Sequence, residues 1–210
     1  TLHQEGTISM ELQKTIENLK KRGFAVTYCA SAAEAADYLD RAIDHVSVGA
    51  GGSVTLRDMG MYEKLASHNE VFWHWYIPEG MTAEEVRARA ESTDVYLTSV
   101  NAIAATGELI NIDGMGNRVA STLYGHKKVY FVAGVNKIAE DYDSALWRAR
   151  NVASPKNAQR LGKKTPCAIK ADRCYDCKSP ERICRGLVVH WEAIRDMACE
   201  VVLIGEDLGF

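Results

Sequence analysis

The chain has 210 residues, of which 47% are hydrophobic and 25% are charged, and its formal net charge is −3. This composition is typical of a globular protein with a sizeable core. A mildly acidic chain has no global positive field, so we expect neither nucleic acid nor a membrane surface as a partner. The sequence contains no apolar run of the roughly 20 residues that a membrane helix needs, and its first residues lack the apolar core of a secretory signal. We therefore expect a cytoplasmic protein.

Segments with helical periodicity alternate along the chain with strand-like segments. Two predicted helices begin with capping-box spacing, Ser31 with Glu34 and Thr82 with Glu85. In chain order, the pattern predicts a helix over 9–23, a strand over 24–29, a helix over 31–43, a strand over 45–50, a helix over 54–66, a strand over 70–76, a helix over 83–92, strands over 94–103, 107–113 and 127–135, helices over 138–151 and 154–161, and strands over 186–194 and 199–210.

This alternation predicts a single α/β domain over residues 1–210, with a mainly parallel sheet flanked by helices. Residues 162–186 interrupt the pattern, because they are polar, irregular and too long for an ordinary connection. We interpret them as a cysteine-rich insertion that binds a metal ion or a cluster.

A glycine turn, VGAGGSVTL, leads from a predicted strand into a predicted helix at residues 48–56. Gly49, Gly51 and Gly52 permit positive φ angles and a close approach of the backbone to a ligand. Ser53 is suited to cap the helix, whose free N–H groups favour an anion. We expect Gly51, Gly52, Ser53 and Thr55 to bind a phosphate or a carboxylate. The alternative is a tight turn that needs glycine for its geometry alone.

A second polar group surrounds the predicted strand at 107–113. Glu108 and Asp113 are candidate catalytic carboxylates, because a carboxylate at a strand end can act as a nucleophile or a general base. Asn117 and Arg118 are candidate ligand-binding residues, since a guanidinium can hold an anion by two hydrogen bonds. Lys137 follows another strand and is expected in the same site. The alternatives are a hairpin with ordinary turn residues and a solvated loop lysine.

Four cysteines lie within the irregular segment, with six, two and six residues between neighbours: Cys167, Cys174, Cys177 and Cys184. Thiols stay reduced in the cytosol, so clustered cysteines there more often bind metal than form disulfides. Four thiolates suit either zinc or an iron–sulfur cluster. The spacing matches neither a zinc ribbon nor a bacterial ferredoxin. Free buried thiols or two disulfides are the alternative.

Positive charge accompanies the cysteines, because residues 160–185 contain eight Lys or Arg and three Asp or Glu. This excess would offset the negative charge of four thiolates around a metal. Ser179 and Pro180 are typical of a helix start, which predicts a short helix that carries Cys184. The two other cysteines, Cys29 and Cys199, are expected in the core.

Six motifs of the chain resemble the lactate-utilisation (LUD) domain family, from about Thr15 to the C-terminus: GGSVTL, NAIAATGELINIDGMGNRVA, KKVYFVAGVNKI, TPC, CYDCKSPERIC and VVLIGEDLGF. The resemblance implies a fold similar to the sugar-phosphate isomerase and CoA-transferase superfamily. It also implies a place in bacterial oxidation of lactate or a related carboxylate, beside iron–sulfur proteins.

Three functional hypotheses follow. In the first, the cysteines hold a [4Fe-4S] cluster with a redox or accessory role, which we favour over zinc because the associations of the family are redox. In the second, an isomerase-like or CoA-transferase-like enzyme or binding protein acts on a small anionic metabolite, and the cysteines hold a structural zinc. In the third, the aromatic run at residues 71–76 contacts other lactate-oxidation subunits or a second copy of the chain, although Trp73 and Trp75 suit the core equally well.

Overall fold

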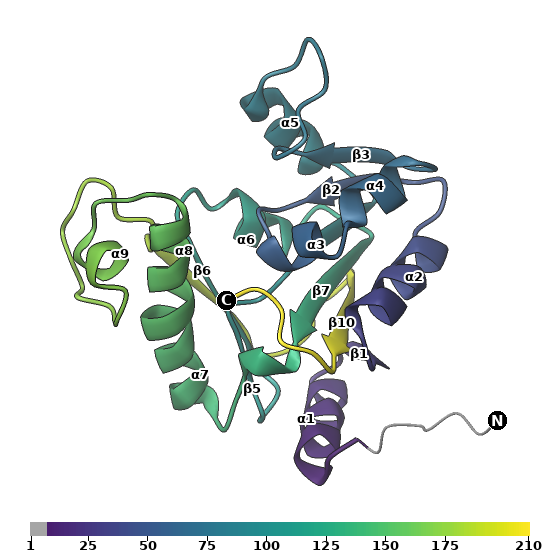
Figure 1. Cartoon of the computed structure of the whole chain (residues 1–210). Coiled ribbons are helices and arrows are strands. Elements are labelled where there is room, and N and C mark those ends of the chain that lie inside the picture. Colours follow the sequence, from purple (N-terminus) through teal and green to yellow (C-terminus); the bar gives the residue numbers. More distant parts are fainter. Residues whose placement is uncertain (1–7) are drawn as a thin grey trace.

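The computed structural model of the protein describes residues 8–210, which form two sheets covered by helices (Figure 1). Every neighbouring pair in the larger, six-stranded sheet is parallel, so the predicted mainly parallel α/β fold is confirmed. Its strand order is β1 (Ala25–Cys29), β10 (Ala198–Ile204), β7 (Lys128–Gly134), β4 (Val95–Thr98), β2 (Ser47–Ala50) and β3 (Glu70–Trp73).

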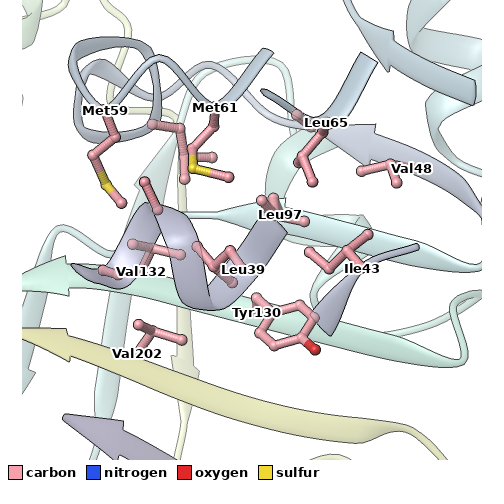
Figure 2. Close-up of a cluster of buried hydrophobic side chains, with 14 of the residues drawn as sticks. Leu39, Ile43, Val48, Met59, Met61, Leu65, Leu97, Tyr130, Val132 and Val202 are labelled. Atoms are coloured by element: carbon pink, nitrogen blue, oxygen red, sulfur yellow. The ribbon is translucent and has the colours of Figure 1, made fainter. Parts of the chain in front are cut away.

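Helices cover both faces of this sheet. Side chains of α1 (Met10–Lys21) and α5 (Ala83–Ala90) pack on one face. On the other face lie α2 (Ala32–Ala42), α3 (Val54–Asp58) and α4 (Met61–Ala66). Figure 2 shows this second core layer, where Leu39 of α2 and Met61 of α4 face the strand residues Leu97, Val132 and Val202. The two apolar layers hold the sheet in the middle of the molecule.

Local sequence signals explain several helix ends. Thr82 and Glu85 form the predicted capping box, in which each side chain accepts a hydrogen bond from the backbone N–H of the other residue. The predicted single helix over 54–66 is wrong, because the chain breaks between α3 and α4 at Gly60. This glycine has φ +66°, a left-handed conformation that interrupts a helix.

A smaller, four-stranded sheet was not expected from the sequence. It contains β8 (Ile138–Ala139), β5 (Ala102–Ala104), β6 (Leu109–Asp113) and β9 (Gly186–His190) in that order. The predicted single strand over 94–103 is wrong, because the chain leaves the large sheet after Thr98 and enters the small one at Ala102. Asn101 holds this crossing, since its N–H donates to Ile110 and its Oδ1 accepts from the N–H of Ile112.

One long helical segment packs on the small sheet, through Ala145 and Ala149 (Figure 1). It consists of α7 (Tyr142–Arg148), the π-helical turn η2 (Ala149–Ala153) and α8 (Ser154–Arg160). The predicted helix over 154–161 is present as α8, but Ser154 does not cap it, because its backbone angles of −65° and −45° are helical and the π-helical turn runs directly into α8. The widened π-helical turn accommodates Pro155, which has no N–H to donate, and the Ser154 hydroxyl donates to the Ala149 carbonyl at 2.9 Å.

Residues 161–185 connect α8 to β9 and contain α9 (Pro166–Lys170). The predicted helix after Ser179 is wrong: the chain makes a turn there, in which the N–H of Arg182 donates to the Ser179 carbonyl at 3.0 Å. The side chain of Arg182 then binds the carbonyls of Cys177 and Cys184, and these bonds direct the chain away from a helical path. Cys167, rather than Cys184, therefore lies in a helix. That the connection is an insertion stays a prediction, as does the division of the chain into a single domain.

The remaining helical elements among the described residues are α6 (Asn117–Ser121) and the 3-10 turn η1 (Val135–Lys137). Within residues 8–210, none of the helices combines the length and the apolar character that a membrane span requires.

Candidate functional site

The carboxyl ends of the parallel strands β2, β4 and β7 meet at one edge of the large sheet, which is the usual ligand side of such folds. The glycine turn follows β2, residues 99–101 follow β4, and η1 follows β7. These segments, together with residues 112–118 and 180–185, line one cleft with a volume of about 510 Å³. This size suits a small metabolite.

Most of the predicted site residues share this cleft. Those that line it are Gly52, Ser53, Thr55, Asp113, Asn117, Arg118 and Lys137. Gly51 and Glu108 are absent from its walls. The cysteine segment contributes the Pro180–Arg185 turn, so the glycine turn and the cysteine segment belong to the same site.

Close packing, rather than backbone freedom, explains the glycines of the turn. None of Gly49, Gly51 and Gly52 adopts the positive φ that glycine permits, because all three lie outside the left-handed region. A Cβ atom on Gly51 would lie 2.7 Å from the Cγ of Arg118, and a Cβ atom on Gly52 would lie 3.3 Å from the Trp75 ring. Gly51 therefore permits Arg118 to pack against the turn. Gly52 forms part of the cleft wall beside Trp75.

Arg118 holds the cleft wall together. Its guanidinium donates to the Asp113 carboxylate at 3.1 Å, to the Asn111 side chain at 2.6 Å and to the Ser99 and Ile112 carbonyls. A longer contact of 3.5 Å to Asn101 engages the remaining N–H group. Since every N–H of the guanidinium has a protein acceptor, Arg118 supplies positive charge to the cleft rather than free donors.

Asp113 is also engaged by the protein. Its carboxylate accepts hydrogen bonds from the N–H groups of Met115 and Gly116 at 3.0 and 2.8 Å, in addition to the bond from Arg118. These contacts fix the turn that leads into α6, where Asn117 is the first helical residue and faces the cleft.

The structure separates Glu108 from the other candidates. Its carboxylate binds the guanidinium of Arg22 at 2.5 Å and the hydroxyl of Thr106, in the hairpin between β5 and β6. The side chain of Arg22 also donates to the carbonyls of Thr106 and Trp191, so the ion pair joins α1 to the small sheet. Glu108 has a structural role in this arrangement, away from the cleft.

Lys137 is buried at the bottom of the cleft, with 4% of its surface exposed. Its Nζ donates to the hydroxyls of Ser99 and Thr55 at 2.8 and 3.2 Å. Burial lowers the pKa of Lys137 to about 7, with a further contribution from the positive charges of Arg148 and Arg118. A substantial fraction of this amine is therefore neutral at physiological pH.

Positive charge dominates the rest of the cleft wall. Six lining residues are Lys or Arg, namely Arg118, Lys137, Arg160, Lys163, Arg182 and Arg185. Two lining residues are acidic, namely Asp113 and Glu181. Asp113 is paired with Arg118 and therefore adds little free negative charge. Such a wall favours a carboxylate or phosphate group of a ligand.

An aromatic side chain flanks the charged wall. The guanidinium of Arg160 lies over the Trp75 ring, 5.1 Å from its centre, and the ring of Trp75 stacks on that of Trp73. Trp73 is fully buried, so the expectation of a core position holds for it, whereas Trp75 is half-buried at the cleft.

Sequence reasoning missed several cleft residues. Ser99 follows β4 directly, so its place at a strand end was a usable signal. Arg182 and Arg185 were noted only as counter-charge for the cysteines, and Trp75 only as a core or interface residue. Their position in the cleft depends on how the 161–185 connection folds back over the sheet edge, which no local pattern encodes.

All four cysteines of the connection line a second, smaller cavity. Cys167 comes from α9, whereas Cys174, Cys177 and Cys184 come from the irregular chain that follows it. Among residues 8–210, however, no group of three or more His, Cys, Asp or Glu side chains is arranged to hold a metal ion. The four cysteines thus share one cavity, but they do not form a metal-ion site among the described residues.

Hydrogen bonds and positive charges surround the sulfur atoms. The N–H of Asp176 points to the Sγ of Cys174 at 3.3 Å, and the hydroxyl of Thr165 lies 3.2 Å from the Sγ of Cys167. A side-chain hydrogen bond and the charge of Cys174 raise the pKa of Arg150, and the charge of Cys184 raises that of Arg182.

The cysteine cavity adjoins the cleft, because Ser154, Arg182 and Ile183 line both. Ser154 lies where the π-helical turn passes into α8, which brings this helix between the two spaces. Figure 1 shows α8 between α9 and the strands of the large sheet. The two candidate sites are thus separated by a wall of single side chains.

Comparisons with known proteins agree with this architecture. The chain is similar to a DUF162 family protein from Deinococcus radiodurans, whose crystal structure superposes with a TM-score of 0.53 at 15% identity, over 95% of this chain and 100% of the other. This likeness concerns the fold. Among curated proteins, none matches the sequence. The profile of the LUD domain matches residues 12–202, and the chain therefore belongs to the LUD domain family.

Proposed function

We propose that the protein binds a [4Fe-4S] cluster through Cys167, Cys174, Cys177 and Cys184 and binds a small anionic metabolite, such as a hydroxycarboxylate, in the adjoining cleft. In this proposal it has a redox or accessory role in lactate or related carboxylate oxidation, beside other subunits of that process. The observation that carries the proposal is that four cysteines line one cavity and that this cavity shares a wall with a cationic cleft.

We favour a cluster over zinc because the resemblance to the LUD domain family implies redox associations. A single zinc ion needs four donors about 2.3 Å from one point. A four-iron cluster instead binds each thiolate through a different iron, so its cysteines surround a larger volume. Both centres take four thiolates, so the set of four cysteines around one cavity fits either of them. The N–H and guanidinium groups near Cys174 and Cys184 are also of the kind that stabilise cluster-bound sulfur.

The charge of the cleft supports an anionic ligand. Lys163 and the four arginines of the wall outnumber the two lining carboxylates, one of which is already paired. A carboxylate or phosphate group would therefore gain more from this wall than a neutral or cationic group. The short wall between cleft and cysteine cavity would keep a bound metabolite close to the cluster, which suits electron transfer or polarisation of the metabolite.

A cysteine variant tests the cluster. We expect anaerobically purified protein to have the brown absorbance of an iron–sulfur cluster, and Cys174→Ser to lose both the colour and the iron. Cys199→Ser is the matched control, because Cys199 is buried in β10 away from the cavity and its variant should keep the iron. Equal metal content in the wild type and in Cys174→Ser would refute the assignment.

A thermal-shift series tests the anionic ligand. Lactate, glycolate, sugar phosphates and CoA thioesters form the panel, and a ligand at about 100 times its Kd should raise the melting temperature by roughly 5–10 °C. A uniform lack of response would contradict an anion-binding cleft. A response to CoA thioesters or sugar phosphates, together with colourless zinc protein, would instead support an isomerase-like or CoA-transferase-like enzyme.

A further inference from the structure

Lys137 is a buried lysine whose surroundings contain no compensating negative charge. In the described part of the chain it forms no salt bridge, and its hydrogen-bond acceptors are the neutral hydroxyls of Ser99 and Thr55. The charges that act on it most strongly are the guanidinium groups of Arg148 and Arg118. A lysine that only stabilises the fold would be expected beside a carboxylate, because burial of an unpaired ammonium is costly.

The two hydroxyls fix the orientation of the amine. A neutral amine has two N–H bonds and one lone pair, and Lys137 can donate its two hydrogens to Ser99 and Thr55. The lone pair then takes the remaining tetrahedral direction. Lys137 and both hydroxyl-bearing residues line the cleft, so a ligand in the cleft meets this nitrogen.

The backbone also closes tightly around this group. Gly209 has φ +63°, and a Cβ atom there would lie 2.6 Å from the Oγ1 of Thr55 and 3.3 Å from the Nζ of Lys137. The chain after β10 thus packs directly against the amine and its partner hydroxyl. With this packing, Lys137 is 4% exposed.

We propose that Lys137 is a reactive amine that forms a reversible imine with a small carbonyl compound carrying a carboxylate or phosphate group, such as a 2-oxo acid. The proposal rests on the anion-binding cleft of the proposed function, but it does not depend on the cluster. Amines that are desolvated and placed near other cations are the type of lysine that reacts with carbonyl groups. The positive wall of the cleft would hold the anionic group of the same molecule.

The chemistry balances without an oxidant or a reductant. The lone pair of Nζ attacks the carbonyl carbon, and the carbonyl π electrons move to the oxygen, which takes up a proton. The resulting carbinolamine loses water, whose oxygen comes from the carbonyl group, and Nζ becomes doubly bonded to carbon. The hydroxyls of Ser99 and Thr55 lie within hydrogen-bond distance of Nζ and are placed to relay these protons.

Reductive trapping tests the proposal. The intact protein is incubated with pyruvate or dihydroxyacetone phosphate and sodium cyanoborohydride, which reduces an imine to a stable secondary amine, and peptides are then analysed by mass spectrometry. We expect one reduced adduct on Lys137 and its loss in Lys137→Met. The two probes distinguish a carboxylate-bearing from a phosphate-bearing carbonyl compound. Lys20→Met is the control, because Lys20 is an exposed lysine of α1 outside the cleft and its variant should still be labelled at Lys137.

The pH dependence of trapping separates a reactive lysine from a merely accessible one. Only the neutral amine attacks, so the labelling rate should rise through pH 7, where Lys137 loses its proton. An ordinary lysine would need a pH near 10. Labelling that is absent, that is spread over surface lysines, or that rises only near pH 10 would overturn the proposal. The pH series is measured on the wild-type protein, so it does not depend on whether a variant folds. Its result is also independent of the metal content measured in the cysteine variants.

Discussion

Replacement of Lys137 by Met should make the protein more stable at neutral pH, by an amount that falls as the pH rises. In the unfolded chain the amine has its ordinary pKa of 10.5, whereas in the folded protein the pKa is about 7. At about 1.4 kcal/mol per pKa unit, the full cost of charging the buried amine is roughly 5 kcal/mol. Met has a similar length and fills the same space without a charge.

The sign follows from proton binding. Between pH 7 and pH 10.5 the unfolded chain binds a proton at Lys137 that the folded protein has lost, so wild-type stability rises with pH relative to the variant. The advantage of Lys137→Met should therefore shrink by roughly 3–4 kcal/mol between pH 7 and pH 10. Below pH 7 the difference should level off, because both states hold the proton.

Urea denaturation of both proteins at half-unit pH steps measures this difference. Subtraction of the two stability curves cancels the groups that titrate alike in both proteins. A difference that stays constant from pH 7 to pH 10 would refute the reasoning. It would mean that Lys137 keeps an ordinary pKa in the folded protein.

Three further substitutions test the assignments around the cleft, the first two by urea denaturation and the third by the affinity for an anionic ligand. Arg118→Met should cost about 3–5 kcal/mol, because it leaves the buried Asp113 carboxylate unpaired; a loss below about 1 kcal/mol would contradict the structural role of Arg118. Gly51→Ala should cost about 1–3 kcal/mol, since the new Cβ meets the Arg118 side chain at 2.7 Å, and a neutral effect would argue against this packing. Glu108→Gln should weaken the contact with Arg22 yet leave ligand affinity unchanged, and a tenfold weaker affinity would place Glu108 in the site.

The parallel α/β core could be predicted from the sequence, because local patterns encode it. Buried strands such as KVYFVAG are continuous apolar runs, and the capping pair Thr82 and Glu85 marks a helix start by residue type alone. The second sheet could not be predicted. Its strand β5 follows β4 after only three residues, 99–101, and the contacts of Asn101 with β6 reveal that the chain changes sheets there.

The site was predicted in part for the same reason. Positions at strand ends, including Ser53, Thr55 and Lys137, can be located once the strands are known. Glu108 also lies at a strand end, but at the opposite end of β6 from Asp113, where Arg22 binds it. The pairing of Arg118 with Asp113, and the low pKa of Lys137, arise from contacts between segments far apart in sequence. Composition and spacing carry no information about such contacts.

Iron, acid-labile sulfide and zinc per chain, measured on anaerobically purified protein, test the central claim most directly. A [4Fe-4S] cluster on Cys167, Cys174, Cys177 and Cys184 predicts about four iron and four sulfide ions per chain, with negligible zinc. About one zinc per chain with no sulfide would contradict the cluster and reduce the cysteine cavity to a structural metal site.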